Sequence, residues 1–268
     1  MNDTTPIALQ LYSVREAAKA DLRGVLKQVA EFGYDGVEFA GFHGHGAAQV
    51  KAWLDEYGLQ CPSTHTGLHE LGDDVFDDVV AYHRAIGCDT ILVPWLPLEK
   101  RNTLASCNET AAFFLELFDK FTALGIRTGF HVHAEDVVPL EPPAGDGRSP
   151  WDIFADATPA EFILEYDTAN GLEGGTDPVA TIHKHPGRSE LLHLKEFGDG
   201  TGRLAGRDGQ SQAALGAGDV DLAAVLAAAR EVGGTRWYIV EQEGHPTLGE
   251  MDAAKACLDS LRRVLGRS

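Results

Sequence analysis

Short apolar runs alternate with amphipathic segments along the whole of this 268-residue chain. The apolar runs are rich in β-branched and aromatic residues, which is typical of buried strands. The segments between them carry apolar residues at three- and four-residue spacings, which is typical of helices. Such alternation predicts parallel strands joined by right-handed helical crossovers. About eight repeats of this kind favour an α/β fold of the closed (β/α)8 type, a TIM barrel.

The apolar runs give the expected strands, at residues 7–13, 35–41, 59–66, 89–96, 126–133, 161–169, 190–197 and 235–243. The amphipathic segments give the expected helices, at residues 22–33, 47–58, 76–87, 109–125, 151–157, 177–186, 220–233 and 251–266. Asp21 is placed to cap the first helix, and glycines end the first four. No change of composition divides the chain, so we expect one domain over residues 1–268.

The alternative fold is an open, Rossmann-like sheet. Its first strand-to-helix turn would be QLYSVREAAKAD at residues 10–21, which lacks the glycine fingerprint of a dinucleotide site. No GxxxxGK[ST] motif occurs either, so the sequence does not predict a P-loop nucleotide site.

The formal net charge of −19 argues against nucleic acid as a partner, because such binders need Lys and Arg to neutralise phosphates. No apolar run approaches the roughly 18 residues of a membrane span. The N-terminus, MNDTTPIALQ, lacks the basic start and the long apolar stretch of a signal peptide. We therefore expect a cytoplasmic protein with no membrane partner, and the sequence leaves open whether it forms a homo-oligomer.

Ionisable side chains end four successive apolar runs in the second half of the chain: His131, Asp167, His193 and Glu241. Burying charge is costly unless the charge is paired or binds a metal. In a (β/α)8 barrel the carboxyl ends of the strands meet at one mouth. We interpret the four residues as ligands of one divalent cation. Mixed Asp, Glu and His ligands suit Mn²⁺, the ion we expect first, or Mg²⁺, Co²⁺ or Zn²⁺.

Each of these residues also has a structural explanation when it is taken alone. A single strand-end histidine is commonly a hydrogen-bonded structural residue, and Asp167 could cap the next helix through DTAN. Their occurrence at equivalent positions of consecutive strands favours the shared site.

Further polar side chains are expected at the same mouth. The predicted catalytic residues are His133, Glu241, Lys195 and Glu38. The predicted substrate-binding residues are Gln10, His65 and Trp95, with Trp151 as a second aromatic that could pack on a sugar ring. Alternation places His133 on the face of His131. Alternatively, Glu38 and Lys195 form only an ion pair across the mouth.

Several segments carry a family resemblance when they are taken together and in order: QLYSVR at 10–15, GYDGVEFAG at 33–41, FHVH at 130–133, YDTAN at 166–170, HLKEF at 193–197, GAGDVDL at 216–222 and YIVEQE at 238–243. The chain resembles the xylose-isomerase-like TIM barrels over nearly its whole length. This sugar phosphate isomerase/epimerase superfamily also contains inosose dehydratases, hydroxypyruvate isomerases and endonuclease IV.

The resemblance implies a metal held by a Glu, an Asp, a His and a Glu from strands five to eight. Asp167, His193 and Glu241 match the last three, whereas Gly129 or Phe130 stands where the first glutamate is usual. His131 would replace it as a ligand. Epimerases of the family are thought to use the two glutamates as paired proton carriers. Losing one makes His133 the natural replacement base, a pattern that resembles the dehydratase and 3-keto-glycoside lyase branches.

The function we expect is a divalent-metal-dependent sugar isomerase or epimerase that removes a proton next to a carbonyl of a sugar or keto-sugar. β-Elimination by a dehydratase or 3-keto-glycoside lyase is the alternative, since it begins with the same step. A non-catalytic sugar-binding or scaffold subunit is a further alternative, and the net charge argues against DNA repair. The glycine-rich loop at 198–218 is a candidate lid, and its Arg203 and Arg207 are candidates for binding a phosphate.

Overall fold

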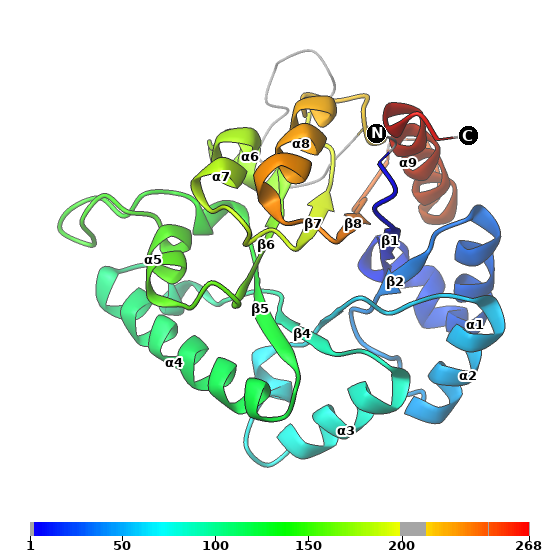
Figure 1. The fold of residues 1–268 in the computed structure, drawn as a ribbon, viewed down its shortest axis with the longest axis horizontal. Helices are drawn as coiled ribbons and strands as arrows, with labels where there is room; N and C mark the ends of the chain where they lie inside the picture. Colours follow the sequence, from blue (N-terminus) through cyan, green and yellow to red (C-terminus); the bar gives the residue numbers. More distant parts are fainter. Residues whose placement is uncertain (1–2, 199–212, 246, 268) are drawn as a thin grey trace.

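The computed structural model describes residues 3–198, 213–245 and 247–267. Within them, eight parallel strands form a barrel that helices surround (Figure 1). The strands are β1 (Ile7–Gln10), β2 (Gly36–Glu38), β3 (Thr64–His65), β4 (Thr90–Val93), β5 (Arg127–His131), β6 (Ile163–Asp167), β7 (Leu191–Leu194) and β8 (Trp237–Val240). The predicted (β/α)8 architecture is confirmed. Most of the candidate lid, including Arg203 and Arg207, lies at residues 199–212, outside the described part of the chain.

The strands follow the order β2-β1-β8-β7-β6-β5-β4-β3, and every pairing is parallel. The two ends of this order are joined by isolated bridges between Gly36 and Gln60 and between Phe39 and Thr64. The amide of His65 also donates to the carbonyl of Phe39, with an N–O distance of 2.8 Å. The sheet therefore closes on itself, and the open Rossmann-like alternative is wrong.

The helices that cover the barrel are α1 (Arg15–Phe32), α2 (Ala47–Tyr57), α3 (Phe76–Ile86), α4 (Leu104–Ala123), α5 (Pro150–Ala157), α6 (Thr168–Glu173), α7 (Pro178–Lys184), α8 (Leu222–Ala228) and α9 (Glu250–Leu265). Short 3-10 turns lie at Leu11–Val14, Leu68–Glu70, Leu98–Lys100 and Ala134–Asp136, and a π-helical turn at Ala229–Gly233 extends α8. Among the described helices, none has both the length and the apolar character needed to span a bilayer.

The first helix begins earlier than the sequence predicts, at Arg15. Asp21 lies inside it with non-helical backbone angles (φ −154°, ψ 81°), and its Oδ1 accepts from the amide of Gly24 at 2.9 Å. Asp21 thus caps the second part of a kinked helix, as its position predicts. Gly33 ends this helix with a φ of 97°, a conformation that suits glycine.

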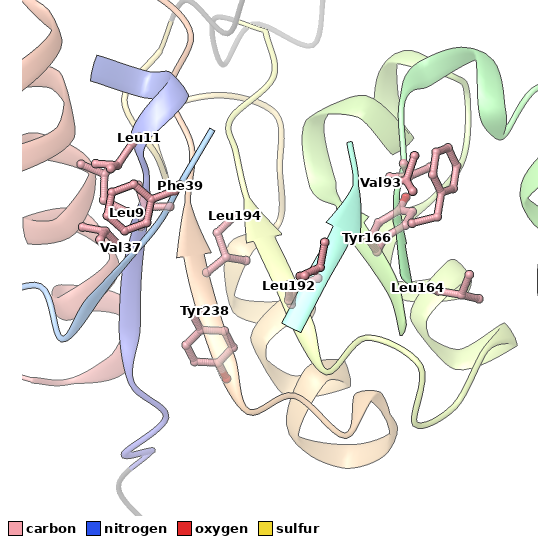
Figure 2. Close-up of a cluster of buried hydrophobic side chains, with 14 of the residues drawn as sticks. Leu9, Leu11, Val37, Phe39, Val93, Leu164, Tyr166, Leu192, Leu194 and Tyr238 are labelled. Atoms are coloured by element: carbon pink, nitrogen blue, oxygen red, sulfur yellow. The ribbon is translucent and has the colours of Figure 1, made fainter. Parts of the chain in front are cut away.

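Alternation along the strands sorts the buried side chains into two layers. The outward-facing layer packs against the helices and includes Leu9, Val37, Leu164, Leu192 and Tyr238 (Figure 2). The inward-facing layer is a smaller cluster formed by Ala8, Leu92, Ile163, Leu191 and Ile239. Since residues two positions further along share the inward direction, the next layer toward the carboxyl ends contains polar residues.

Glu196 ties the end of β7 to the segment that leads into α8. Its side chain is fully buried, and its oxygens accept from the amides of Phe197 (3.0 Å), Gly216 (2.7 Å) and Val220 (2.9 Å). A buried carboxylate that accepts several backbone hydrogen bonds holds those segments in place.

Glu196→Ala should lower the free energy of unfolding by about 3 kcal/mol, because three amides lose a charged acceptor in a buried place. Glu31→Ala, at an exposed position of α1, is the matched control and should change it by less than about 0.5 kcal/mol. Urea denaturation followed by circular dichroism measures both. Equal stabilities of the two variants would contradict this role for Glu196.

Candidate functional site

The four predicted metal ligands meet at the mouth of the barrel. His131, Asp167 and His193 come from β5, β6 and β7, and Glu241 directly follows β8. Each offers a nitrogen or oxygen atom that lies within 4.8 Å of those of the other three, and all four residues are buried. His193 is central, with Nδ1 2.7 Å from Glu241 Oε2 and 3.9 Å from Asp167 Oδ2. The convergence that the strand-end pattern predicts is present.

Asp167 performs one of the two roles considered for it, the helix cap, and its other oxygen is placed for the second. Its Oδ1 accepts from the amide of Asn170 at 2.7 Å and so caps α6. Its Oδ2 is buried and has no hydrogen-bond partner among the described residues. A buried carboxylate oxygen without a partner is costly, and a cation would satisfy it. Together with two imidazoles and a second carboxylate, this donor set fits a divalent metal of the first transition row or Mg²⁺.

The electrostatics of the group also suit a bound cation. Burial raises the pKa of Asp167 to about 6, an effect that nearby Lys195 offsets only in part. Burial lowers the pKa of His193, but the carboxylates of Glu165 and Glu38 outweigh this and raise it well above its ordinary value. A bound cation would act against both shifts, since it favours a charged carboxylate and an unprotonated imidazole nitrogen.

Lys195 lies beside this group as a buried ammonium. Its Nζ is 3.3 Å from Glu241 Oε1 and also contacts Glu243. Burial lowers the pKa of Lys195, yet Glu241, Asp167 and Glu243 together hold it well above its ordinary value. Lys195 is therefore a permanent positive charge. Its ion pairs are with these glutamates and not with Glu38, so the alternative of an ion pair between Glu38 and Lys195 is wrong.

His133 lies just beyond β5, on the same side as His131, with a ring-centroid distance of 5.2 Å between them. Its amide donates to Asp136 Oδ2 at 2.7 Å, and Asp136 in turn accepts from Arg101 at 2.9 Å. Its Nδ1 is buried and has no partner among the described residues. Burial, followed by Lys195, lowers the pKa of His133 to about 4. His133 is thus a neutral imidazole held in place through its backbone.

A cavity of about 720 Å³ opens above these residues. Of the predicted residues, it is lined by Gln10, His65, Trp95, His131, His133 and Glu241. Trp95 and Tyr12 expose 50% and 45% of their surface, so aromatic faces are available at the rim. The two predicted catalytic residues Glu38 and Lys195 are buried and are not among the described lining. Trp151 is in the hydrophobic core, 6.2 Å from Phe130 by ring centroids, so its predicted place at the opening is wrong.

Glu165 is the residue to which the sequence pattern assigned no role. It is fully buried one pleat before Asp167, and its Oε2 lies 2.8 Å from both His131 Nδ1 and His65 Nε2. Alternation along β6 could have indicated it, because residues 165 and 167 share a face.

Comparison with known proteins agrees with this fold. The family model of the xylose isomerase-like TIM barrel matches residues 26–264. The chain belongs to that family. It is 25% identical over 255 residues to an inosose dehydratase from Geobacillus kaustophilus (strain HTA426), covering 84% of this chain and 80% of the relative.

Two solved structures show the same fold at lower identity. A sugar phosphate isomerase/epimerase from Parabacteroides distasonis ATCC 8503 superimposes with a TM-score of 0.78 at 20% identity, over 97% of this chain and 94% of that one. The IOLI protein, in a structure with a binding zinc atom, has a TM-score of 0.77 at 14% identity, over 97% of this chain and 98% of that one.

The structure also explains why β5 offers His131 to the cluster and has no carboxylate at position 129. Gly129 pairs with Ile163, and a Cβ on Gly129 would lie 2.2 Å from the carbonyl oxygen of Ile163. Phe130 points outward and packs in the hydrophobic core. His131 is therefore the first position on this strand with both the direction and the space to reach the cluster.

Gly129→Ala should lower the free energy of unfolding by about 1–3 kcal/mol through overpacking against the neighbouring strand. Gly46→Ala is the control, because a Cβ there meets no atom within 4 Å and the change should stay within about 1 kcal/mol. Chemical denaturation of both variants tests this. A Gly129→Ala variant as stable as the parent would show that strand five has room for a side chain there.

Proposed function

We propose that this protein is a metal-dependent enzyme that removes a proton next to the carbonyl of a sugar or keto-sugar. One divalent cation would be held by His131, Asp167, His193 and Glu241, with Mn²⁺ as the expected ion and Mg²⁺, Co²⁺ or Zn²⁺ as alternatives. The observation that carries this proposal is the convergence of four buried donor groups within 4.8 Å, one of which, Asp167, has an oxygen with no partner in the described part of the chain. A cation at such a site polarises a carbonyl and so acidifies the adjacent C–H bond.

The chain's own residues would do the rest of the chemistry. His133 lines the cavity with a neutral ring whose Nδ1 has no partner within residues 3–198, 213–245 and 247–267, so it is suited to accept the proton. The carboxylate of Glu241 borders the same cavity and is the candidate proton carrier on the opposite face of the substrate. Lys195 stays protonated and would stabilise the negative charge that develops on the substrate as the proton leaves.

A hydroxyl-rich substrate suits the remaining lining. Glu70, Glu135 and Glu173 bring carboxylates to the cavity, and carboxylates accept hydrogen bonds from hydroxyl groups. The exposed faces of Trp95 and Tyr12 can pack against the apolar side of a sugar ring. Relatives named as a dehydratase and as an isomerase/epimerase support a sugar-modifying enzyme of this kind.

Two outcomes can follow the shared first step. Isomerisation or epimerisation returns the proton to the substrate, whereas β-elimination expels a leaving group one carbon further on. Two features support elimination as the second candidate: strand five has Gly129 where the paired glutamate of an epimerase is usual, and a relative is named inosose dehydratase.

Metal analysis of the purified protein should find about one divalent cation per chain after dialysis against Mn²⁺ or Zn²⁺. Asp167→Asn keeps the size of the side chain and an oxygen that can cap α6, but it should weaken binding by more than about 100-fold, beyond the effect of losing an outer-shell partner. Asp156→Asn, at an exposed position of α5, should bind like the parent. A parent protein that binds no cation would favour the non-catalytic sugar-binding or scaffold subunit.

Proton abstraction can be followed by deuterium exchange into a panel of keto-sugars in D₂O with the metal present. His133→Asn should slow exchange by about 100-fold or more, the contribution of a general base, while metal binding stays unchanged. His183→Asn, at an exposed histidine of α7, is the control. Exchange at the parent rate in the His133 variant would place the base elsewhere. The product, a new keto-sugar or an unsaturated one, separates isomerisation from elimination.

A further inference from the structure

A second group of buried polar side chains, called here the deeper layer, adjoins the proposed ligands, and its Glu165 lies one pleat below Asp167 on β6. It consists of Gln10, Glu38, His65 and Glu165, from β1, β2, β3 and β6. Glu38 and Glu165 are fully buried, and no described residue pairs either of them with a Lys or Arg. Two carboxylates in such a place need hydrogen-bond donors, and the donors present are the side-chain amide of Gln10, imidazole nitrogens and the hydroxyl of Ser63, which donates to Glu38 Oε1.

The hydrogen-bond directions in this layer can be followed from one fixed donor. The backbone amide of Tyr12 donates to Gln10 Oε1 at 2.9 Å, so the other end of this side-chain amide is its NH₂ group. That NH₂ donates to Glu38 Oε2 at 2.7 Å and faces His65 Nδ1 at 3.2 Å. Since Nδ1 of His65 then accepts, its Nε2 carries the proton and donates to Glu165 Oε2 at 2.8 Å.

The same carboxylates reach the two histidines of the proposed metal site. His193 Nε2 lies 2.7 Å from Glu38 Oε2, and His131 Nδ1 lies 2.8 Å from Glu165 Oε2. A neutral imidazole has one N–H and one lone pair. With the protons on the nitrogens that face the deeper layer, the lone pairs remain on His193 Nδ1 and His131 Nε2. Nδ1 of His193 is the nitrogen that faces Glu241 and Asp167.

We propose that Glu38 and Glu165 are positioning residues that fix the tautomer and ring orientation of the metal ligands His193 and His131, respectively. This inference rests on the proposed metal site. It replaces the prediction of Glu38 as a catalytic residue with a role through His193. Outer carboxylates that hold a ligating imidazole in this way also increase its basicity, and losing one costs roughly 10–100-fold in metal affinity.

A competing interpretation is a second cation in the deeper layer. His65, His131, Glu165 and His193 also offer donor atoms within 4.8 Å of one another. His131 and His193 would then belong to both sites, and each imidazole would have to lose both ring protons. A neutral imidazole has a single lone pair to give, so the geometry favours one cation supported by a hydrogen-bonded layer.

The test compares the parent with Glu38→Met, Glu165→Met, Glu38→Gln and Glu165→Gln. Methionine keeps the length of the side chain but cannot accept as a carboxylate does, whereas glutamine keeps one oxygen. We expect Zn²⁺ affinity to fall by about 10–100-fold in the methionine variants and by less in the glutamine variants. Glu109→Gln, at an exposed position of α4, should bind within about twofold of the parent. Thermal unfolding of the metal-free proteins identifies any variant that does not fold. If a methionine variant does not fold, the Zn²⁺ affinity of the corresponding glutamine variant is compared with that of the parent.

A direct readout is long-range ¹⁵N–¹H NMR of histidine-labelled protein loaded with Zn²⁺. In the parent we expect the proton of His193 on Nε2 and that of His131 on Nδ1, with the metal on the other nitrogen of each ring. In the variants that lose a carboxylate we expect Zn²⁺ on a mixture of the two ring nitrogens. A merely structural carboxylate would leave these tautomers unchanged.

Three outcomes would overturn the inference: parent-like affinity and tautomers in the variants of both carboxylates, the metal on Nε2 of His193, or two Zn²⁺ ions per chain. Its failure can be told from that of the proposed function. If the parent binds one Zn²⁺ and Asp167→Asn abolishes this, the metal site stands whatever the deeper carboxylates do.

Discussion

Backbone hydrogen bonds hold neighbouring strands of this barrel in a fixed parallel register, and that register sets the height of every side chain at the mouth. Asp167 is the register partner of His193, and His131 is the partner of Glu165. The first pair therefore lies at one level and Glu165 lies one pleat deeper than Asp167. A slip of one residue on any of these strands would turn its polar side chains toward the helices. Site geometry and barrel closure are thus the same constraint.

The polar interior has a stability cost that the apolar layers must offset. Below the mouth the barrel is filled by aliphatic side chains such as Leu92, Ile163 and Ile239, and outside it the strands pack on helices. Between them, Glu38, Glu165 and His193 are fully buried. Buried ionisable groups are tolerated when each finds partners, and a cluster with some atoms unpaired is characteristic of sites that bind ligands.

The sequence predicted the fold and the converging ligands because both depend on regular periods. Apolar runs of strand length between amphipathic segments indicate a (β/α)8 barrel, and a ligand at a strand end is visible as an abrupt change from aliphatic to ionisable. The expected strand at residues 161–169 ran past Asp167 into α6, because Asp167 ends β6 and caps the helix at once, which leaves no loop between them. Trp151 was misplaced because its position depends on how α5 packs against Phe130, a long-range contact without a sequence signal. The direction of each hydrogen bond around Glu38 likewise depends on residues from strands far apart in the chain.

Pairing between the first and last strands has a consequence for how the protein is made. β8 lies between β7 and β1, and Glu241 follows it directly. During synthesis, His131, Asp167 and His193 are made well before Glu241. Until β8 has been made, β1 lacks one of its two neighbouring strands. On the proposed assignment, tight cation capture is confined to the finished barrel. A complete set of donor atoms is therefore present only once β8 has paired with β7 and β1.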